Sequence, residues 1–235
     1  MNRLMSFLRD GAILVAGSIA CFGSALALPV LQLDIEGGSY VGGDEESMVT
    51  NDPVFNLYSY LTEKQGADTG DLFRLSIALI PKPAAELPVP NFGSFLVDGT
   101  AYDVTDMIYG TPPVEALSNP DELPGHGVYD SYYLELDYFF DPNDEAAPVN
   151  VQDNGGLGPQ AGTGMFYHLF EIDVSNMLSG FFLHFDTYDP TDPNTIKAPF
   201  SHDARTVPEP GTLLLFGAGL LGLAFSRRLI AAKVA

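Results

Sequence analysis

Two short stretches of the chain concentrate aspartate side chains whose oxygens could bind a cation. Asp141 and Asp144 lie in the first stretch, and Asp189 and Asp192 lie in the second. Calcium takes about six to eight oxygen ligands, and sites outside the cell are often weak. Neither stretch has the EF-hand spacing, and the prolines in both restrict the loop shapes. Two interpretations stay open, a weak calcium site and solvated acidic turns, and the second is favoured.

The histidines show no spacing typical of a metal site. A metal needs about three or four convergent ligands, and neither an H-x-H nor an H-E-x-x-H pattern occurs. His168 has the same strand parity as Phe166 and Phe170, which favours a buried, hydrogen-bonded ring. His168 and His184 are expected on strands that could pair. The four histidines are His126, His168, His184 and His202.

No grouping of residues predicts a catalytic centre or a cofactor site other than the calcium candidates. The chain has no G-x-S-x-G elbow, and paired carboxylates carry no information in so acidic a sequence. Some tyrosines could form a sugar-stacking platform on a sheet face, although packing in the core or across strands is favoured. These tyrosines are Tyr129, Tyr132, Tyr133 and Tyr138. We therefore expect a protein that is not an enzyme.

Two glycine-containing stretches resemble nucleotide motifs in the wrong context. Residues 42–46, Gly-Gly-Asp-Glu-Glu, resemble the GGDEF loop of cyclic-dinucleotide synthases. That loop belongs to a cytoplasmic α/β domain, so an acidic hairpin loop is the favoured interpretation. Residues 217–222 match G-x-G-x-x-G, but no acidic residue follows them as a dinucleotide site requires. These glycines fit better as small residues of a membrane helix.

The C-terminal residues combine a stiff turn, an apolar run and a basic end. Val207, Pro208, Glu209 and Pro210 form the turn, residues 211–225 carry no charge, and Arg227 and Arg228 follow. An uncharged run closed by arginines is typical of a membrane segment with a cytoplasmic basic flank. We predict a transmembrane helix here, with the preceding chain on the opposite side of the membrane.

These three elements, in this order at this end, resemble a PEP-CTERM sorting signal over residues 207–235. The resemblance implies a Gram-negative bacterial protein that is handled by exosortase, a membrane-embedded cysteine transpeptidase. It also implies cleavage near the Pro-Glu-Pro turn after a transient stay in the inner membrane. Proteins with this signal accompany exopolysaccharide and biofilm production, so the expected destination is the cell surface or the extracellular matrix.

The N-terminus carries a matching export signal. Arg3 and Arg9 supply positive charge, a small apolar run follows, and Ala25-Leu26-Ala27 forms an A-x-A cleavage site. We predict a helical signal peptide over residues 1–27. Its removal takes away Cys21, the single cysteine, so the mature protein is expected to contain no disulfide.

The charge of the chain restricts its partners. The net charge is −21, and both terminal segments are slightly positive, so the part between them is more acidic still. Such a surface repels nucleic acid and anionic polymers unless cations intervene. Nucleic acid is therefore excluded as a partner, while an extracellular polysaccharide remains a candidate.

Alternating apolar residues predict an all-β body over residues 28–188. Asp98-Gly99 is a hairpin turn signal, and the connection over 141–164 is long, glycine-rich and expected to be mobile. Many short strands between Gly and Pro residues favour a β-sandwich of immunoglobulin-like or jelly-roll type. The predicted strands lie over residues 31–36, 55–61, 73–79, 92–98, 100–108, 132–138, 166–172 and 181–185.

The body also resembles the choice-of-anchor N group of secreted bacterial proteins. The resemblance is carried by residues 28–37, 106–113 and 180–188. That group has no established biochemical activity that could be transferred. Residues 189–206, rich in Pro, Asp and Thr, are expected to form a spacer between the body and the sorting signal.

Together these features predict an exported, exosortase-sorted surface protein with a structural or adhesive role in the exopolysaccharide layer. Two other functions stay open. A secreted carbohydrate-active enzyme would need a cleft with convergent carboxylates. A calcium-dependent carbohydrate-binding module would need an exposed aromatic patch.

Overall fold

The computed structural model describes residues 28–41, 47–81, 83, 85–88, 90–114, 130–193, 196, 198 and 203–206. The predicted signal peptide, the sorting signal with its helix, and residues 42–46 lie outside this part of the chain. Within the described residues, no helix has the length and apolar character needed to cross a membrane.

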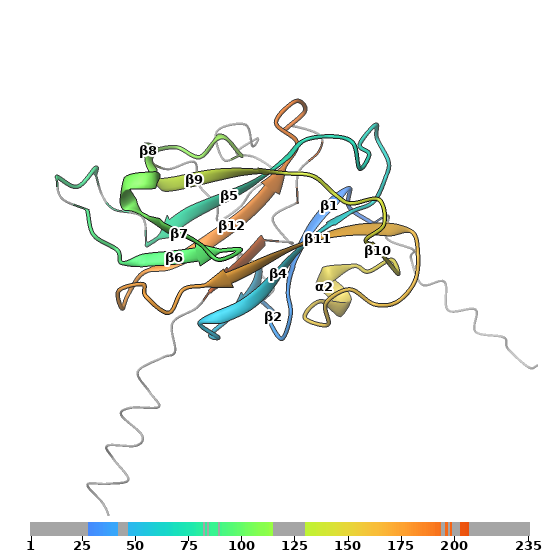
Figure 1. Ribbon diagram of the computed structural model, residues 1–235, viewed down its shortest axis with the longest axis horizontal. Helices are drawn as coiled ribbons and strands as arrows, with labels where there is room; N and C mark the ends of the chain where they lie inside the picture. The colour runs from blue at the N-terminus through green and yellow to red at the C-terminus, as the bar shows by residue number, and fades with distance from the viewer. Residues whose placement is uncertain are drawn as a thin grey trace, which may run out of the picture.

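The described body is mostly β-structure, as predicted, and its strands form two sheets (Figure 1). One sheet has the order β1 (Leu31–Ile35), β4 (Val54–Leu61), β11 (Met165–Asp173), β6 (Ser94–Val97) and β7 (Thr100–Asp103), with β10 (Glu145–Ala146) also pairing with β11. The other has the order β2 (Ser39–Val41), β3 (Ser47–Thr50), β13 (Asp203–Thr206), β12 (Phe182–Tyr188), β5 (Phe73–Ile80), β9 (Ser131–Tyr138) and β8 (Ile108–Gly110). We call them the first and the second sheet.

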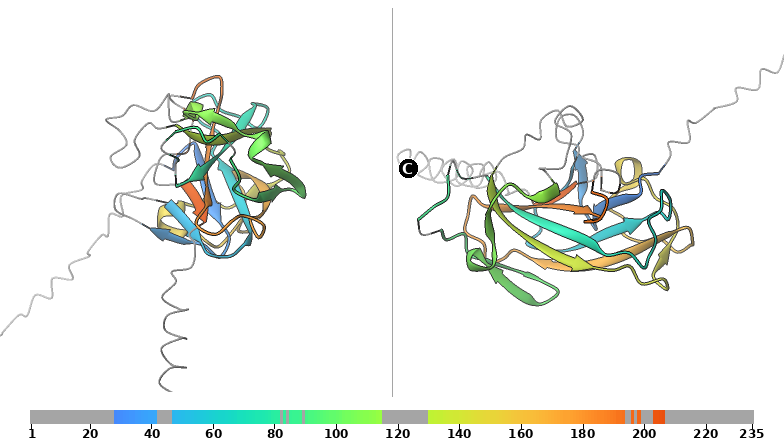
Figure 2. Two further views of the ribbon diagram at one scale, coloured as in Figure 1. Left: turned by 90° about the vertical axis from the view of Figure 1, so that its left-hand side faces the viewer. Right: turned by 90° about the horizontal axis from the view of Figure 1, so that it is seen from above.

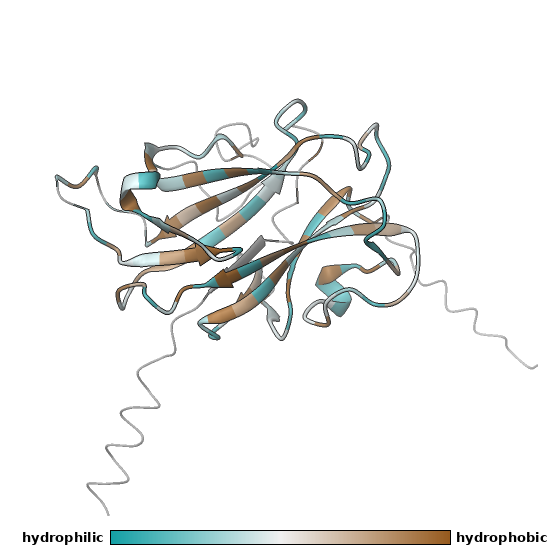
Figure 3. Ribbon diagram, in the orientation of Figure 1, coloured by the Kyte–Doolittle hydropathy of each residue, from teal (hydrophilic) through white to brown (hydrophobic). Residues whose placement is uncertain are grey.

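The two sheets lie against each other, as the views in Figure 2 show, and share one hydrophobic core. On β5, the predicted alternation buries Phe73, Leu75, Ile77 and Leu79. Phe55 of the first sheet meets Phe185 of the second edge to face, with 6.1 Å between ring centroids. Apolar bands alternate with polar ones along the strands in Figure 3. Packed sheets of this kind agree with a sandwich, and its finer type stays a prediction.

The hairpin β6–β7 turns at Asp98-Gly99, as predicted. Both residues have positive φ, 51° and 74°, which suits the tight turn between two strands. The strand predicted over residues 100–108 is too long, because Asp103 ends β7 and caps the 3-10 helix η1 (Val104–Asp106) by accepting a hydrogen bond from the Thr105 amide. The chain then continues into β8, which belongs to the second sheet.

Strand β1 was expected to be half-buried, but all five of its residues are buried. The connection over residues 141–164, expected to be mobile, folds over its outer face and contains the short helix α2 (Val151–Asn154). Gln32 donates to the Val149 carbonyl and accepts from the Val151 amide, each over 3.0 Å. The expected half-burial of β1 is therefore wrong, because polar side chains of β1 bind the backbone of the connection. The mobility of the connection stays a prediction.

Residues 189–206 also differ from the predicted spacer at the positions that the structure describes. Ile196 and Ala198 are buried, and the Ala198 amide donates to the Thr187 carbonyl. Strand β13 pairs in parallel with β3 and antiparallel with β12. The described residues of this range therefore belong to the fold, and the periodicity of the sequence is too weak to predict that.

Candidate functional site

The body is open along one side, where neighbouring strands of both sheets end their pairing early. Strand β8 pairs with β9 only as far as Tyr133. Among the described residues, the rest of β9, residues 134–138, pairs with β5 alone. On β11, residues 168–170 lie between the short contacts with β10 and β6. A surface cleft of about 350 Å³ lies at this place, between β9, β11 and the β6–β7 hairpin. Small-molecule sites start at about this volume.

The hairpin supplies one wall of the cleft with Asp98, Thr100 and Tyr102. Both the backbone and the side chain of Asp98 form hydrogen bonds with Glu171. The Asp98 amide donates to the Glu171 carbonyl, and Asp98 Oδ1 accepts from the Glu171 amide at 2.8 Å. The ring of Tyr102 stacks on the ring of its cross-strand partner Phe95 at 5.8 Å. The polar and aromatic groups of this wall are therefore fixed by the hairpin.

Tyr138 and Phe170 form the apolar base of the cleft, with their rings edge to face at 5.1 Å. The buried Tyr138 hydroxyl lies between the hydroxyls of Ser59 and Thr187, which belong to different sheets. Burial raises the pKa of Tyr138, so the phenol stays neutral. This network joins the two sheets beneath the cleft and keeps its base rigid.

His168 also lines the cleft and packs against Tyr138 and Phe170 at 4.9 and 4.5 Å between ring centroids. Its Nδ1 lies 2.9 Å from the Phe139 carbonyl. Burial lowers the pKa of His168 below its usual value, so the neutral ring dominates at neutral pH. The predicted hydrogen-bonded histidine is thus confirmed, although its ring is half-buried.

Asp137 lies on the opposite wall, on β9, and receives a hydrogen bond from Arg74 Nε at 2.8 Å. A second arm of the same guanidinium contacts Glu135 at 3.4 Å. These groups are partly exposed, so the ion pairs position the side chains and contribute little to stability.

The calcium candidates lie in separate turns of the described chain. Asp141 Oδ1 accepts from the backbone and side-chain nitrogens of Asn143, and Asp144 lies exposed in the same turn. Asp189 Oδ1 accepts from Thr191 and from the amide of Asp192. The described residues contain no group of three or more His, Cys, Asp or Glu side chains that could hold a metal. This geometry favours acidic turns, and calcium binding stays a prediction without a site.

Tyr132 and Tyr138 are buried, so packing is confirmed as their use, and Tyr129 lies outside the described residues. His168 and His184 lie on β11 and β12, in different sheets, so the prediction that their strands could pair is wrong. Of the three candidate tyrosines that the structure describes, Tyr138 alone lines the cleft.

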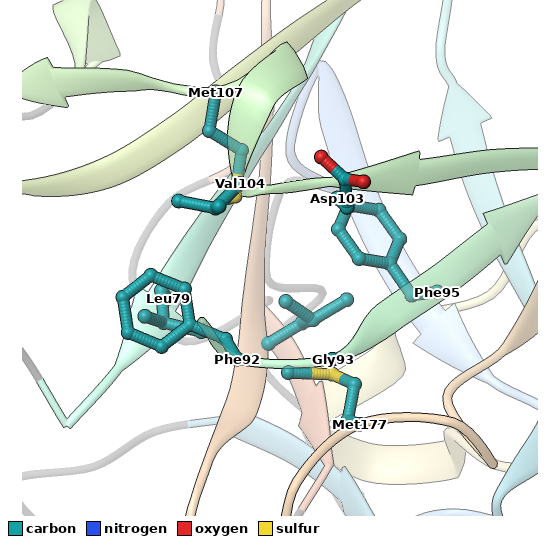
Figure 4. Close-up of a pocket in the computed structure, with 9 residues that line it drawn as sticks. Leu79, Phe92, Gly93, Phe95, Asp103, Val104, Met107 and Met177 are labelled. Atoms are coloured by element: carbon teal, nitrogen blue, oxygen red, sulfur yellow. The ribbon is translucent and has the colours of Figure 1, made fainter. Parts of the chain in front are cut away.

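A second, small cavity lies inside the sandwich near η1 (Figure 4). It encloses about 10 Å³, room for one water at most, and its lining is mainly apolar. Gly93 lies at its edge, where an added Cβ would come 2.2 Å from the Asn176 carbonyl oxygen. We interpret this cavity as a packing gap, not a binding site.

Comparison with known families supports the interpretation of the C-terminus. Residues 206–228 match the PEP-CTERM protein-sorting motif, a range that contains Val207–Pro210, Arg227 and Arg228. The chain therefore carries the signal of an exported protein that exosortase sorts at the membrane, with the surface or the exterior as its destination. No curated protein and no solved structure matches the chain. The resemblance of the body to the choice-of-anchor N group is not supported.

Proposed function

We propose that this exosortase-sorted protein binds saccharide in the exopolysaccharide layer, with a structural or adhesive role. The observation that carries the proposal is the cleft between β9, β11 and the β6–β7 hairpin. It combines aromatic rings with a few fixed polar groups, as sites for small polar ligands do. Because the cleft opens at the surface, a saccharide unit can reach these groups from the solvent.

The delivery of the protein completes the proposal. Export begins with the signal peptide, cut after Ala27, and the C-terminal segment holds the chain transiently in the inner membrane of a Gram-negative cell. Exosortase then cleaves near Val207–Pro210 and releases the body to the surface or the matrix. The match to the sorting motif supports this order of events.

Binding is favoured over hydrolysis by the engagement of the two carboxylates in the cleft. Asp98 and Asp137 both line it, which keeps a carbohydrate-active enzyme as the second candidate. Each carboxylate, however, already accepts a hydrogen bond from a protein N–H group, of Glu171 and of Arg74 respectively. One oxygen of each carboxylate is thus held by the protein, which suits a fixed acceptor for a ligand, whereas a general acid must carry a proton to the glycosidic oxygen. We therefore propose no catalytic residue.

The test compares retention of the purified exported protein on exopolysaccharide from the producing cells. Tyr102→Leu removes the polar aromatic ring from the cleft but keeps an apolar contact with Phe95. We expect retention to fall about fivefold, the loss of one aromatic contact. Tyr40→Leu is the matched control, because Tyr40 is also partly buried and does not line the cleft. Equal retention of both variants and the unaltered protein would contradict the proposal.

A further inference from the structure

The histidine of the cleft offers a lone pair to a ligand. The Phe139 carbonyl can only accept a hydrogen bond, so the proton of the neutral His168 ring must lie on Nδ1. Nε2 then carries the lone pair and acts as an acceptor. A ligand that meets this ring must therefore supply a donor.

The two carboxylates add acceptors and negative charge. Asp98 uses Oδ1 for the Glu171 amide, and Asp137 uses Oδ1 for Arg74. Each keeps a second oxygen, Oδ2, beyond these bonds, and an ionised carboxylate has no proton to donate. Only Asp137 has a cation among these partners, so the hairpin wall presents the uncompensated charge of Asp98.

The aromatic wall favours the same kind of ligand. Tyr102 presents a ring that Phe95 supports from one side, and the electron-rich face of tyrosine attracts cations. The whole chain has a net charge of −21, so an acidic polymer meets repulsion before it reaches the cleft. The charge, the acceptors and the ring therefore all select a ligand that is a cationic hydrogen-bond donor.

We propose that the cleft binds amino-sugar residues with free ammonium groups in a partly or fully deacetylated hexosamine polymer. Asp98 receives the ammonium from the hairpin wall, Tyr102 contacts it through its ring, and His168 Nε2 accepts from a neighbouring hydroxyl. The inference rests on the proposed function, because it names the saccharide class that the same cleft takes.

The experiment measures binding of the purified exported protein to a glucosamine hexamer and to its fully N-acetylated counterpart by calorimetry. At about pH 6 an ordinary amine is protonated, so the two probes differ in charge. We expect the glucosamine hexamer to bind about tenfold more tightly, the gain of a charge-assisted hydrogen bond over a neutral one. Asp98→Asn should remove most of this preference, since asparagine keeps Oδ1 for the Glu171 amide and tolerates the positive φ of 51°.

The control is Asp52→Asn, which removes the same charge from an exposed turn outside the cleft. Equal losses in the Asp98 and Asp52 variants would show general charge attraction and overturn the inference. Tighter binding of the acetylated hexamer, reduced by Tyr102→Leu, would overturn the inference while the proposed function stands. Binding of neither hexamer, together with full retention of the Tyr102 variant on native exopolysaccharide, would overturn both.

Discussion

Replacing Asp34 by asparagine should stabilise the body at neutral pH. Asp34 lies in the middle of β1 with 1% of its surface exposed, and its Oδ1 accepts a 2.6 Å hydrogen bond from the Gly156 amide. The pKa of Asp34 is raised from 3.8 to about 6, because burial and, to a smaller extent, the nearby Glu36 charge outweigh the lowering effect of the backbone hydrogen bonds. The folded state therefore prefers the protonated acid.

The sign and size of the effect follow from proton linkage. Between pH 3.8 and about 6 the folded chain binds more protons at Asp34 than the unfolded chain, so this residue lowers stability as the pH rises. The shift of about two units corresponds to about 3 kcal/mol lost once the pH exceeds 6. Asparagine is neutral at every pH and keeps the oxygen that accepts from Gly156. Relative to the unaltered protein, the variant should gain about 2.5 kcal/mol in free energy of unfolding between pH 4 and pH 7.5, on top of a pH-independent effect of replacing one carboxylate oxygen by a nitrogen that cannot accept.

Chemical denaturation of both proteins at several pH values tests this reasoning. The difference in unfolding free energy between variant and unaltered protein is the quantity to follow, because the many other carboxylates then cancel. Asp52→Asn serves as the control, since its side chain is exposed and should give a difference close to zero throughout. A difference that stays constant from pH 4 to pH 7.5 would refute the assignment of a raised pKa to buried Asp34.

Three further outcomes are expected. Glu209→Ala, or deletion of residues 211–235, should change C-terminal processing and surface retention, seen by cell fractionation, and unchanged fractions would count against the role of the motif. Melting curves in millimolar calcium and in chelator should coincide, because Asp141 and Asp189 accept hydrogen bonds within their own turns. A higher melting temperature in calcium, by several degrees, would instead indicate a calcium site. Gly93→Ala should cost about 2 kcal/mol more than Gly66→Ala in urea unfolding, since both glycines have positive φ but only at Gly93 would a Cβ meet backbone, 2.2 Å from Asn176; equal costs would exclude the clash.

Local patterns in the sequence predict much of the fold. Alternation of apolar residues identifies β5, and the Asp98-Gly99 pair identifies the β6–β7 hairpin. Both signals act between residues that are close in the chain. The burial of β1 is different. It depends on Gln32 and Asp34 binding a segment more than a hundred residues away. The periodicity within β1 does not contain that information. It predicts that Gln32 and Asp34 face solvent, whereas the connection over residues 141–164 covers them.

The cleft shows the same limit for the candidate site. Its residues come from β6, β7, β9 and β11 and from the turn at Asp98, and it lies where, among the described residues, one edge of β9 and one edge of β11 have no ladder partner. The order of strands in a sheet cannot be read from alternation. The sequence indicates a turn at Asp98 and a strand at Asp137, but no signal in it relates the two. His168 was singled out through its parity, and the structure adds the Phe139 carbonyl that orients it.

Strand β13 gives the sorting signal an unusual mechanical setting. It ends at Thr206, the position where the matched motif begins, and it is held between β3 and β12. While the C-terminus is still held in the membrane, before cleavage, tension on the body would thus load the strand along its length. Its hydrogen bonds on both sides would share that load in shear instead of breaking one by one. Exosortase, in turn, would have to cleave within a few residues of the end of a strand that is paired on both sides.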